Sequence, residues 1–324
     1  MCKLIAEFCQ NHNGDFNLLA KMVEKASLSG ASYGKMQNIF ADTITYRPQF
    51  EHGLIEDGVI KAIKRPYSDE YKRLKKLEIS LKDTEKFIKI CHDNGLIPLT
   101  TCFARSHVNI LANLGFKSIK VASYDCASFP MLREMSNKYE EIILSTGAMN
   151  DDEIKHAANI LSHKNYSMLH CVTLYPTPLD QLHLNRMSWL RDICPVVGYS
   201  DHSHVVNSGL TASKLAMALG ADIIERHFTL LPENQTKDGP VSITPEQLSE
   251  LHNFSKLTID ERFESIKNEY PNWKIMLGDR DRKLSDEELL NRDYYRGRFA
   301  SIRISGALGE NMIYNWEETP LSND

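Results

Sequence analysis

The chain has 324 residues, of which 42% are hydrophobic and 25% are charged. This composition excludes a disordered chain, and the length is sufficient for one large core or two smaller ones. The formal net charge of -5 and a pI near 6.2 give no basic surface for nucleic acid, so we expect no nucleic-acid partner. The lysine-rich segment 72–76 is interpreted as the solvated face of a helix.

The seven cysteines are scattered, odd in number and without a Cys-x-x-Cys pair. This pattern is typical of neither a disulfide framework nor a zinc ribbon. Most of the cysteines lie in or beside apolar runs, so we expect reduced core residues in a cytoplasmic protein. The first residues have no signal-peptide pattern, and no apolar run is long enough to span a bilayer, so no membrane partner is expected.

Along the chain, short apolar runs alternate with amphipathic stretches that have helical period. The runs predict eight strands, at 4–7, 33–37, 96–100, 118–122, 141–145, 167–171, 196–199 and 222–226. The stretches between them predict helices that include 17–29, 81–94, 108–114, 151–161 and 206–219. Eight strands close a barrel, and no glycine-rich dinucleotide turn follows the first strand. We therefore predict an α/β fold of the (β/α)8 TIM barrel type rather than a doubly wound sheet.

Two histidines are the strongest indication of a site. His202 and His227 each follow an apolar run, and on adjacent parallel strands two imidazoles can share one metal ion. A single histidine would be better explained as a strand cap. Two of them, with Asp201 and Glu225 beside them, favour a divalent metal that polarises a carbonyl, and hence an enzyme.

Other polar residues also follow the predicted strands, at the end of a barrel where chemistry collects. Two lysines with several hydroxyls suit an anionic phosphate group. Any one of these residues alone is equally well explained as a satisfied polar group at a strand end, but their convergence indicates a single site. The candidates are Glu7, Lys35, Gln37, Thr101, Lys120, Ser123, Asp125, Thr173, Tyr175, Ser200 and Glu225.

Eight short motifs, in this order, resemble those of the sialic acid synthase family, which condenses phosphoenolpyruvate with an amino sugar aldehyde to make a nonulosonic acid. The resemblance runs from about residue 4 to residue 245, and an ordered set of this size is specific. The motifs are AEFCQNHNG (6–14), KMQ (35–37), TTCF (100–103), IKVAS (119–123), ILSTG (143–147), HCVTLYPTP (170–178), GYSDH (198–202) and IIERHF (223–228).

This resemblance implies a role for each candidate residue. His202 and His227 would bind a divalent metal ion, Mn²⁺ first and Mg²⁺ or Co²⁺ as alternatives. The catalytic residues would be Glu7, Gln37, Asp125 and Glu225. The residues that bind phosphoenolpyruvate would be Lys35, Thr101, Lys120, Ser123, Thr173, Tyr175 and Ser200. The partners implied are phosphoenolpyruvate, a sugar aldehyde and a second copy of the chain in a homodimer.

Three departures from the family concern the sugar pocket. The family often has glutamate where this chain has Asp125, and asparagine where it has Thr173. Its Gly-Pro-Asp segment appears here as 238–245 without the following acid. N-acetylmannosamine, a diacetamido-hexose and a smaller aldehyde therefore all stay open as the acceptor, with N-acetylmannosamine expected to be a poor one.

A further departure is at the end of the chain, where the family commonly has an antifreeze-like domain that supplies an arginine to the partner subunit. We expect a barrel at 1–255, a bracing helix and loop at 256–290, and a short C-terminal extension at 291–324 in place of the full domain. Arginines of the extension could replace the lost one, although a solvated basic strand edge is the simpler interpretation. They are Arg292, Arg296 and Arg298.

Two other functions stay open from the sequence. One is a different phosphoenolpyruvate-condensing synthase, which would make a 3-deoxy-ulosonate. The other is a non-catalytic relative that has lost part of its pocket, against which the retention of both histidines, both lysines and Glu225 counts.

Overall fold

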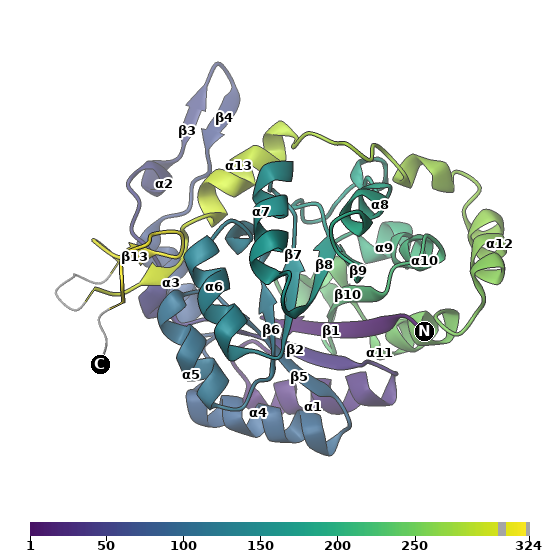
Figure 1. Ribbon diagram of the computed structural model, residues 1–324, viewed down its shortest axis with the longest axis horizontal. Helices are drawn as coiled ribbons and strands as arrows, with labels where there is room; N and C mark the ends of the chain where they lie inside the picture. Colours follow the sequence, from purple (N-terminus) through teal and green to yellow (C-terminus); the bar gives the residue numbers. More distant parts are fainter. Residues whose placement is uncertain (304–308, 322–324) are drawn as a thin grey trace.

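The computed structural model describes residues 1–303 and 309–321, and a closed barrel of parallel strands lies at its centre (Figure 1). The first and last strands close it, with Ile5 opposite Glu225. The eight barrel strands are β1 (Lys3–Cys9), β2 (Tyr33–Asn38), β5 (Ile97–Cys102), β6 (Ser118–Val121), β7 (Glu141–Ser145), β8 (Asn165–His170), β9 (Val197–Asp201) and β10 (Ile223–Phe228). The prediction of a (β/α)8 TIM barrel is confirmed, and each predicted strand is present.

Helices between the strands cover the outside of the barrel and pack against it with their apolar faces. They are α1 (Phe16–Leu28), α3 (Tyr67–Lys75), α4 (Leu81–Asp93), α5 (Val108–Asn113), α6 (Phe129–Lys138), α7 (Asp151–Leu161), α8 (Arg186–Arg191), α9 (Val205–Ser208), α10 (Thr211–Ala218) and α11 (Pro245–Phe254). The prediction of one helix over 206–219 is wrong. Gly209, at φ +55°, ends α9 in a left-handed conformation, and the chain starts again as α10.

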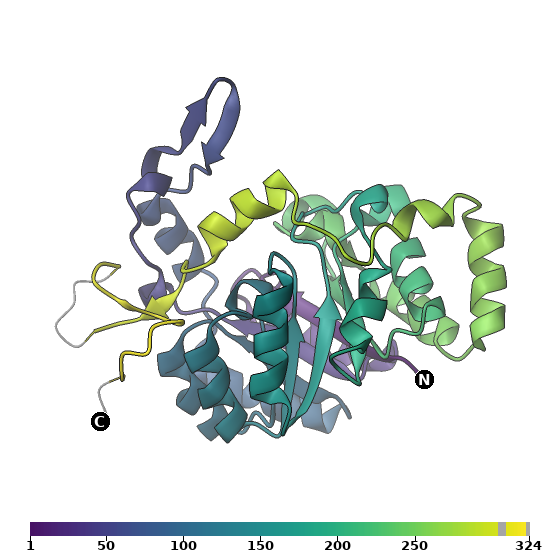
Figure 2. The same cartoon turned by 45° about the horizontal axis from the view of Figure 1, so that its top comes forward.

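Several elements lie outside the barrel repeat. Helix α12 (Ile259–Glu269) packs on α10, and α13 (Asp286–Tyr295) crosses the expected boundary between 290 and 291. The short strands that the sequence did not predict are β3 (Leu54–Glu56), β4 (Val59–Ala62), β11 (Ser242–Ile243), β12 (Ala300–Ser301) and β13 (Ile313–Tyr314), with the one-turn helix α2 (Gln49–His52) before the first of them. Figures 1 and 2 both show the β3–β4 hairpin projecting away from the barrel. The division at 255 and 290 stays a prediction.

All seven cysteines are buried and unbridged. Within the described parts of the chain, no helix has both the length and the apolar character that a bilayer crossing requires.

Every second residue of a strand faces the inside of the barrel, because successive side chains point to opposite faces. The inward-facing side chains form two layers. The lower layer is apolar and consists mainly of Ile5, Tyr33, Leu99, Ile143, Leu169 and Ile223. Ser118 and Gly198 hold the corresponding positions on the other two strands, and a β-carbon at Gly198 would lie 2.3 Å from the Ile223 carbonyl oxygen. Two residues further along each strand, the same face carries the upper layer: Glu7, Lys35, Thr101, Lys120, Ser145, Cys171, Ser200 and Glu225. The barrel thus has an apolar floor below a polar mouth.

The outward face of β9 and β10 carries a fully buried ion pair. Arg226 Nη1 lies 2.5 Å from Asp201 Oδ1. The second carboxylate oxygen accepts a hydrogen bond from Ser213 Oγ of α10 at 2.5 Å, and Arg226 Nη2 donates to the Ser203 carbonyl at 2.9 Å. This network fixes the carboxyl ends of the two strands against the helix layer, next to His202 and His227.

Replacing Asp201→Ala should lower the free energy of unfolding by about 3–5 kcal/mol, because the Arg226 guanidinium would stay buried without its partner. The double variant Asp201→Ala/Arg226→Met should recover part of this loss, since it removes the orphaned charge. Chemical denaturation of the three proteins measures both effects.

The control is Glu140→Ala, which breaks an exposed pair with Lys117 (Nζ to Oε1, 3.2 Å). This change should alter the free energy of unfolding by less than about 1 kcal/mol. If Asp201→Ala lowers the free energy of unfolding by no more than Glu140→Ala does, the structural role of the buried pair is contradicted.

Candidate active site

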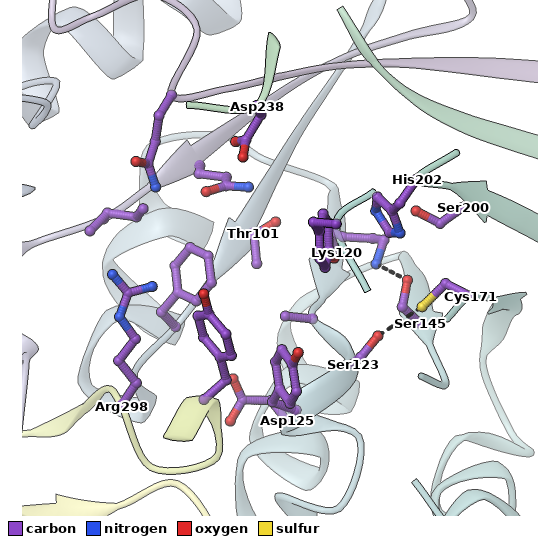
Figure 3. A pocket seen from close by; sticks show the side chains of 18 of the residues that line it. Thr101, Lys120, Ser123, Asp125, Ser145, Cys171, Ser200, His202, Asp238 and Arg298 are labelled. Carbon is purple, nitrogen blue, oxygen red and sulfur yellow. Dashed lines mark hydrogen bonds between the residues drawn. The ribbon is translucent and has the colours of Figure 1, made fainter. Parts of the chain in front are cut away.

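A cavity of about 350 Å³ opens at the carboxyl ends of the barrel strands (Figure 3). Of the thirteen predicted site residues, eleven line it: Lys35, Gln37, Thr101, Lys120, Ser123, Asp125, Tyr175, Ser200, His202, Glu225 and His227. Two do not. Glu7 lies behind Lys35, and Thr173 is fully buried, with its carbonyl accepting a hydrogen bond from Asn291 Nδ2 at 2.9 Å.

Lys35 lies between two buried carboxylates. Its Nζ donates to Glu7 and is 3.2 Å from Glu225 Oε2. Burial lowers the pKa of Lys35 to about 8, although Glu225 opposes the change. Burial alone would raise the pKa of Glu225, but Lys120 and Lys35 outweigh it and hold that pKa below its usual range. The carboxylate is therefore ionised near neutral pH and the lysine is largely cationic.

A second lysine stands among hydroxyl groups. Lys120 Nζ donates to Ser145 Oγ at 2.5 Å and to the Val121 carbonyl at 3.0 Å. Ser123 Oγ lies 3.0 Å from Cys171 Sγ. Figure 3 shows these side chains grouped on one side of the pocket. An ammonium group surrounded by hydroxyls can satisfy several oxygens of one phosphate group.

His202 and His227 come together as the sequence predicted, with ring centres 5.4 Å apart. The Tyr175 ring lies 4.1 Å from the His202 ring. Burial lowers the pKa of both imidazoles, so they are neutral and offer lone pairs. Nδ1 of each ring is buried and has no hydrogen-bond partner in residues 1–303 and 309–321. Two unpartnered imidazole nitrogens at a polar mouth fit a divalent cation.

A second group of potential metal ligands overlaps this pair. Cys9, His227 and Asp238 offer ligand atoms that all lie within 4.8 Å of one another. The sequence predicted neither Cys9 nor Asp238 as part of a site, since the cysteine was assigned to the core. Strand alternation gave no reliable signal for Cys9, because the pairing of β1 with β2 shifts register between Glu7 and Cys9.

The outer part of the pocket is strongly cationic. Arg65, Arg73, Lys237 and Arg298 all line it. Glu70 is shared by two of them, at 3.1 Å from Arg73 Nη2 and 2.5 Å from Arg298 Nη2. Burial, with Arg73 and Arg65 nearby, lowers the pKa of Lys237 to about 8. Segment 72–76 is therefore not a wholly solvated face, because Arg73 turns into the pocket.

The interpretation of the three tail arginines as a solvated basic strand edge is wrong. Arg298 is buried and lines the pocket, and Figure 3 shows it across the cavity from His202. Arg292 donates to both carboxylate oxygens of Glu153, at 2.7 and 2.6 Å, and Arg296 donates to one of them at 3.4 Å. The extension thus contributes a cation to the pocket of its own barrel.

Residues 22–260, more than half of the chain, match the NeuB family. The chain belongs to this family. It is 33% identical to the N,N'-diacetyllegionaminic acid synthase of Campylobacter jejuni, with 98% of both chains covered. The synthase of the same name from Legionella pneumophila is 30% identical over 89% of this chain and 76% of that protein. The predicted resemblance to the sialic acid synthases is confirmed.

A solved structure supports the same assignment. The N-acetylneuraminic acid synthetase of Leptospira borgpetersenii superposes with a TM-score of 0.66 at 25% identity, over 90% of each chain. Proteins with these names are synthases that form carbon–carbon bonds, and this NeuB-family chain is an enzyme of that class.

Asp125 marks one of the departures within the NeuB-family pocket. Its Oδ1 accepts hydrogen bonds from Ser128 Oγ at 3.0 Å and from Asn315 Nδ2 at 2.9 Å. Burial raises the pKa of Asp125 to about 6, and these two donors only partly oppose the shift. Because Asn315 lies in the C-terminal extension, the tail also touches the site here.

The raised pKa of Asp125 predicts a pH-dependent difference between the wild type and Asp125→Asn. Between about pH 4 and about pH 6 the folded wild type keeps a proton that the unfolded chain has lost, so its free energy of unfolding decreases as the pH rises. The wild type should lose about 3 kcal/mol relative to the variant across this window. Asparagine can still accept both hydrogen bonds. Denaturation midpoints of both proteins at several pH values measure the difference, and a difference that does not change with pH would show that Asp125 titrates normally.

Proposed function

We propose that this chain condenses phosphoenolpyruvate with an amino sugar aldehyde, releases phosphate and forms a nonulosonic acid. The observation that carries the proposal is the composition of one buried barrel mouth. Lys35 and Lys120 suit an anionic substrate there, while His202 and His227 suit a divalent cation. The names of the relatives support the same class of product.

Phosphoenolpyruvate is proposed to bind at the lysine end of the pocket. Lys120, with Ser123 and Ser145, would hold the phosphate group, and Lys35 would hold the carboxylate. Thr101, Tyr175 and Ser200 line the space between these groups and the histidines. Thr173, by contrast, does not reach this space with its side chain, and Glu7 acts on substrate only through Lys35.

The reaction forms one carbon–carbon bond and one carbon–oxygen bond to water, and it breaks the carbon–oxygen bond to phosphate. The enol carbon of phosphoenolpyruvate attacks the aldehyde carbon, water adds to the resulting cationic carbon, and phosphate leaves. A divalent cation held by His202 and His227, Mn²⁺ or a similar ion, would supply polarisation of the aldehyde carbonyl. Glu225 faces the pocket as a carboxylate and is placed to accept the proton of the incoming water. The two lysines keep the anion fixed while charge moves, which lowers the barrier.

The acceptor is proposed to be a diacetamido sugar rather than N-acetylmannosamine. The two legionaminic acid synthases among the relatives carry two acetyl groups in the names of their products. The departure at Asp125 lies in the pocket wall. Arg298, which also lines the pocket, would take the place of the arginine that the antifreeze-like domain supplies elsewhere in the family. A location in the cytoplasm is proposed as well, since seven buried, unbridged cysteines suit a reducing compartment. The homodimer is proposed from the resemblance to the family alone.

Phosphate release in mixtures of the enzyme with phosphoenolpyruvate, Mn²⁺ and a panel of aldehydes tests this function. A diacetamido hexose should give phosphate together with a new nonulosonic acid, and N-acetylmannosamine should give less. Turnover only with four- or five-carbon sugar phosphates would instead identify a 3-deoxy-ulosonate synthase. Binding of phosphoenolpyruvate without turnover of any aldehyde would identify a non-catalytic relative.

Lys120→Ala should raise the KM for phosphoenolpyruvate by roughly 10- to 100-fold, because a charged hydrogen bond to an anion contributes about 1.5–3 kcal/mol. The KM for the aldehyde should change much less. Steady-state kinetics with each substrate varied in turn separates the two effects. Lys117→Ala is the control, since that lysine is exposed just before the amino end of β6. An effect confined to the aldehyde would place Lys120 at the sugar instead.

A further inference from the structure

We infer that the divalent cation proposed to be held by His202 and His227 is also bound by a thiolate, with Cys9 and Asp238 beside His227 as its further ligands. The inference rests on the proposed function for the location of the reacting aldehyde. It goes beyond that function in naming a sulfur ligand, which the histidine pair alone does not require.

The distances between the ligand atoms match one small cation. Cys9 Sγ lies 3.1 Å from Asp238 Oδ2, and His227 Nδ1 lies 3.8 Å from the same oxygen. Tetrahedral bonds of about 2.0–2.3 Å to oxygen, nitrogen and sulfur place neighbouring ligand atoms roughly 3.3–3.7 Å apart. All three ligand atoms lie within 4.8 Å of one another, so binding a single ion requires side-chain shifts of at most about 1 Å.

The backbone at Cys9 is bent toward this arrangement. Cys9 has φ +39°, in the left-handed region that non-glycine residues rarely adopt, and the pairing of β1 with β2 shifts register between Glu7 and Cys9. Glu7 Oε1 holds the bend by accepting a hydrogen bond from the Cys9 amide at 2.6 Å. Such strain persists where the surroundings fix it, and a bulge re-aims a side chain. Here it directs the thiol toward Asp238.

The charge of the Asp238 carboxylate also favours a cation beside Cys9 and His227. Cys9 is fully buried and His227 nearly so, whereas Asp238 is partly exposed. Within residues 1–303 and 309–321, no lysine or arginine forms an ion pair with the Asp238 carboxylate, which lies beside the Cys9 thiol and the neutral His227 imidazole. A divalent ion would neutralise this carboxylate. Asp238 keeps about a quarter of its side chain exposed (23%), so the position faces the pocket and an incoming aldehyde.

A thiolate ligand changes which metals the site prefers. Sulfur ligands favour Zn²⁺, Co²⁺ and Fe²⁺ over the harder Mn²⁺ and Mg²⁺. The wild type should therefore prefer Co²⁺ to Mn²⁺ more strongly than a variant without the thiol does. This preference differs from the Mn²⁺ site that two histidines alone suggest.

Titration of the metal-free enzyme with Co²⁺, without substrates, tests the ligand set. The wild type should develop a near-ultraviolet sulfur-to-cobalt charge-transfer band. Cys9→Ser should lose the band and bind Co²⁺ at least about tenfold more weakly. Asp238→Asn should also weaken binding yet keep the band. Cys9→Gly is a second test, because glycine relieves the left-handed backbone and so guards against a folding defect.

The matched control is Cys194→Ser. Cys194 is also buried, and its thiol donates to the Val196 carbonyl at 3.2 Å, before the amino end of β9 and away from the pocket. It should keep both the band and the affinity. An unchanged band in Cys9→Ser and Cys9→Gly, or no band in the wild type, would overturn the inference. Because no substrate is present, that outcome is distinct from a failure of phosphate release, which would count against the proposed function alone.

Discussion

The position of Lys35 between Glu7 and Glu225 is the constraint on which the site depends. A charge inside a closed barrel is out of reach of bulk water, so it is tolerated only when it is paired. The pairing exists because the barrel closes. Strand β1 lies between β2 and β10, which sets Glu7 beside Lys35 on one side and beside His227 on the other. An anionic substrate entering this mouth meets a fixed balance of charges rather than a flexible surface, and fixed dipoles and charges are what lower a barrier to charge movement.

The two faces of the same strands separate stability from chemistry. On β10, Glu225 and His227 face the cavity, whereas Arg226 between them faces the helices and pairs with Asp201. Because side chains alternate, the outward pair can hold the strand ends without entering the pocket. Substitutions of the outward residues should therefore act on folding, and substitutions of the inward ones on binding, although they are neighbours in sequence.

The sequence predicted well the features that depend on the local spacing of apolar and polar residues. Apolar runs located all eight strands, and the polar residues at their ends were those with inward-facing positions, such as Lys35 and Lys120. It failed where position depends on distant contacts. Glu7 was predicted as a catalytic residue, but its ion pair with Lys35 and its hydrogen bond from the Cys9 amide could not be predicted from the sequence. Arg298 was named only as one of three candidates on the tail and Arg73 not at all, because only the fold brings a helix and the C-terminal extension to the same Glu70.

The C-terminal extension lies on the barrel of its own chain through buried polar contacts. Arg105, itself buried, donates to the carbonyls of Glu317 and Thr319 at 2.6 and 3.0 Å, and Asn315 reaches Asp125 in the pocket wall. The cavity therefore has two kinds of wall. Strand ends form the inner wall, where a single register shift would move every side chain to the other face. Loops and the extension form the outer wall, where charges such as Arg298 are held by individual ion pairs. In the proposed reaction the inner wall binds phosphoenolpyruvate and the outer wall binds the sugar, so the choice of sugar can change through the outer wall while the bond-forming chemistry is retained.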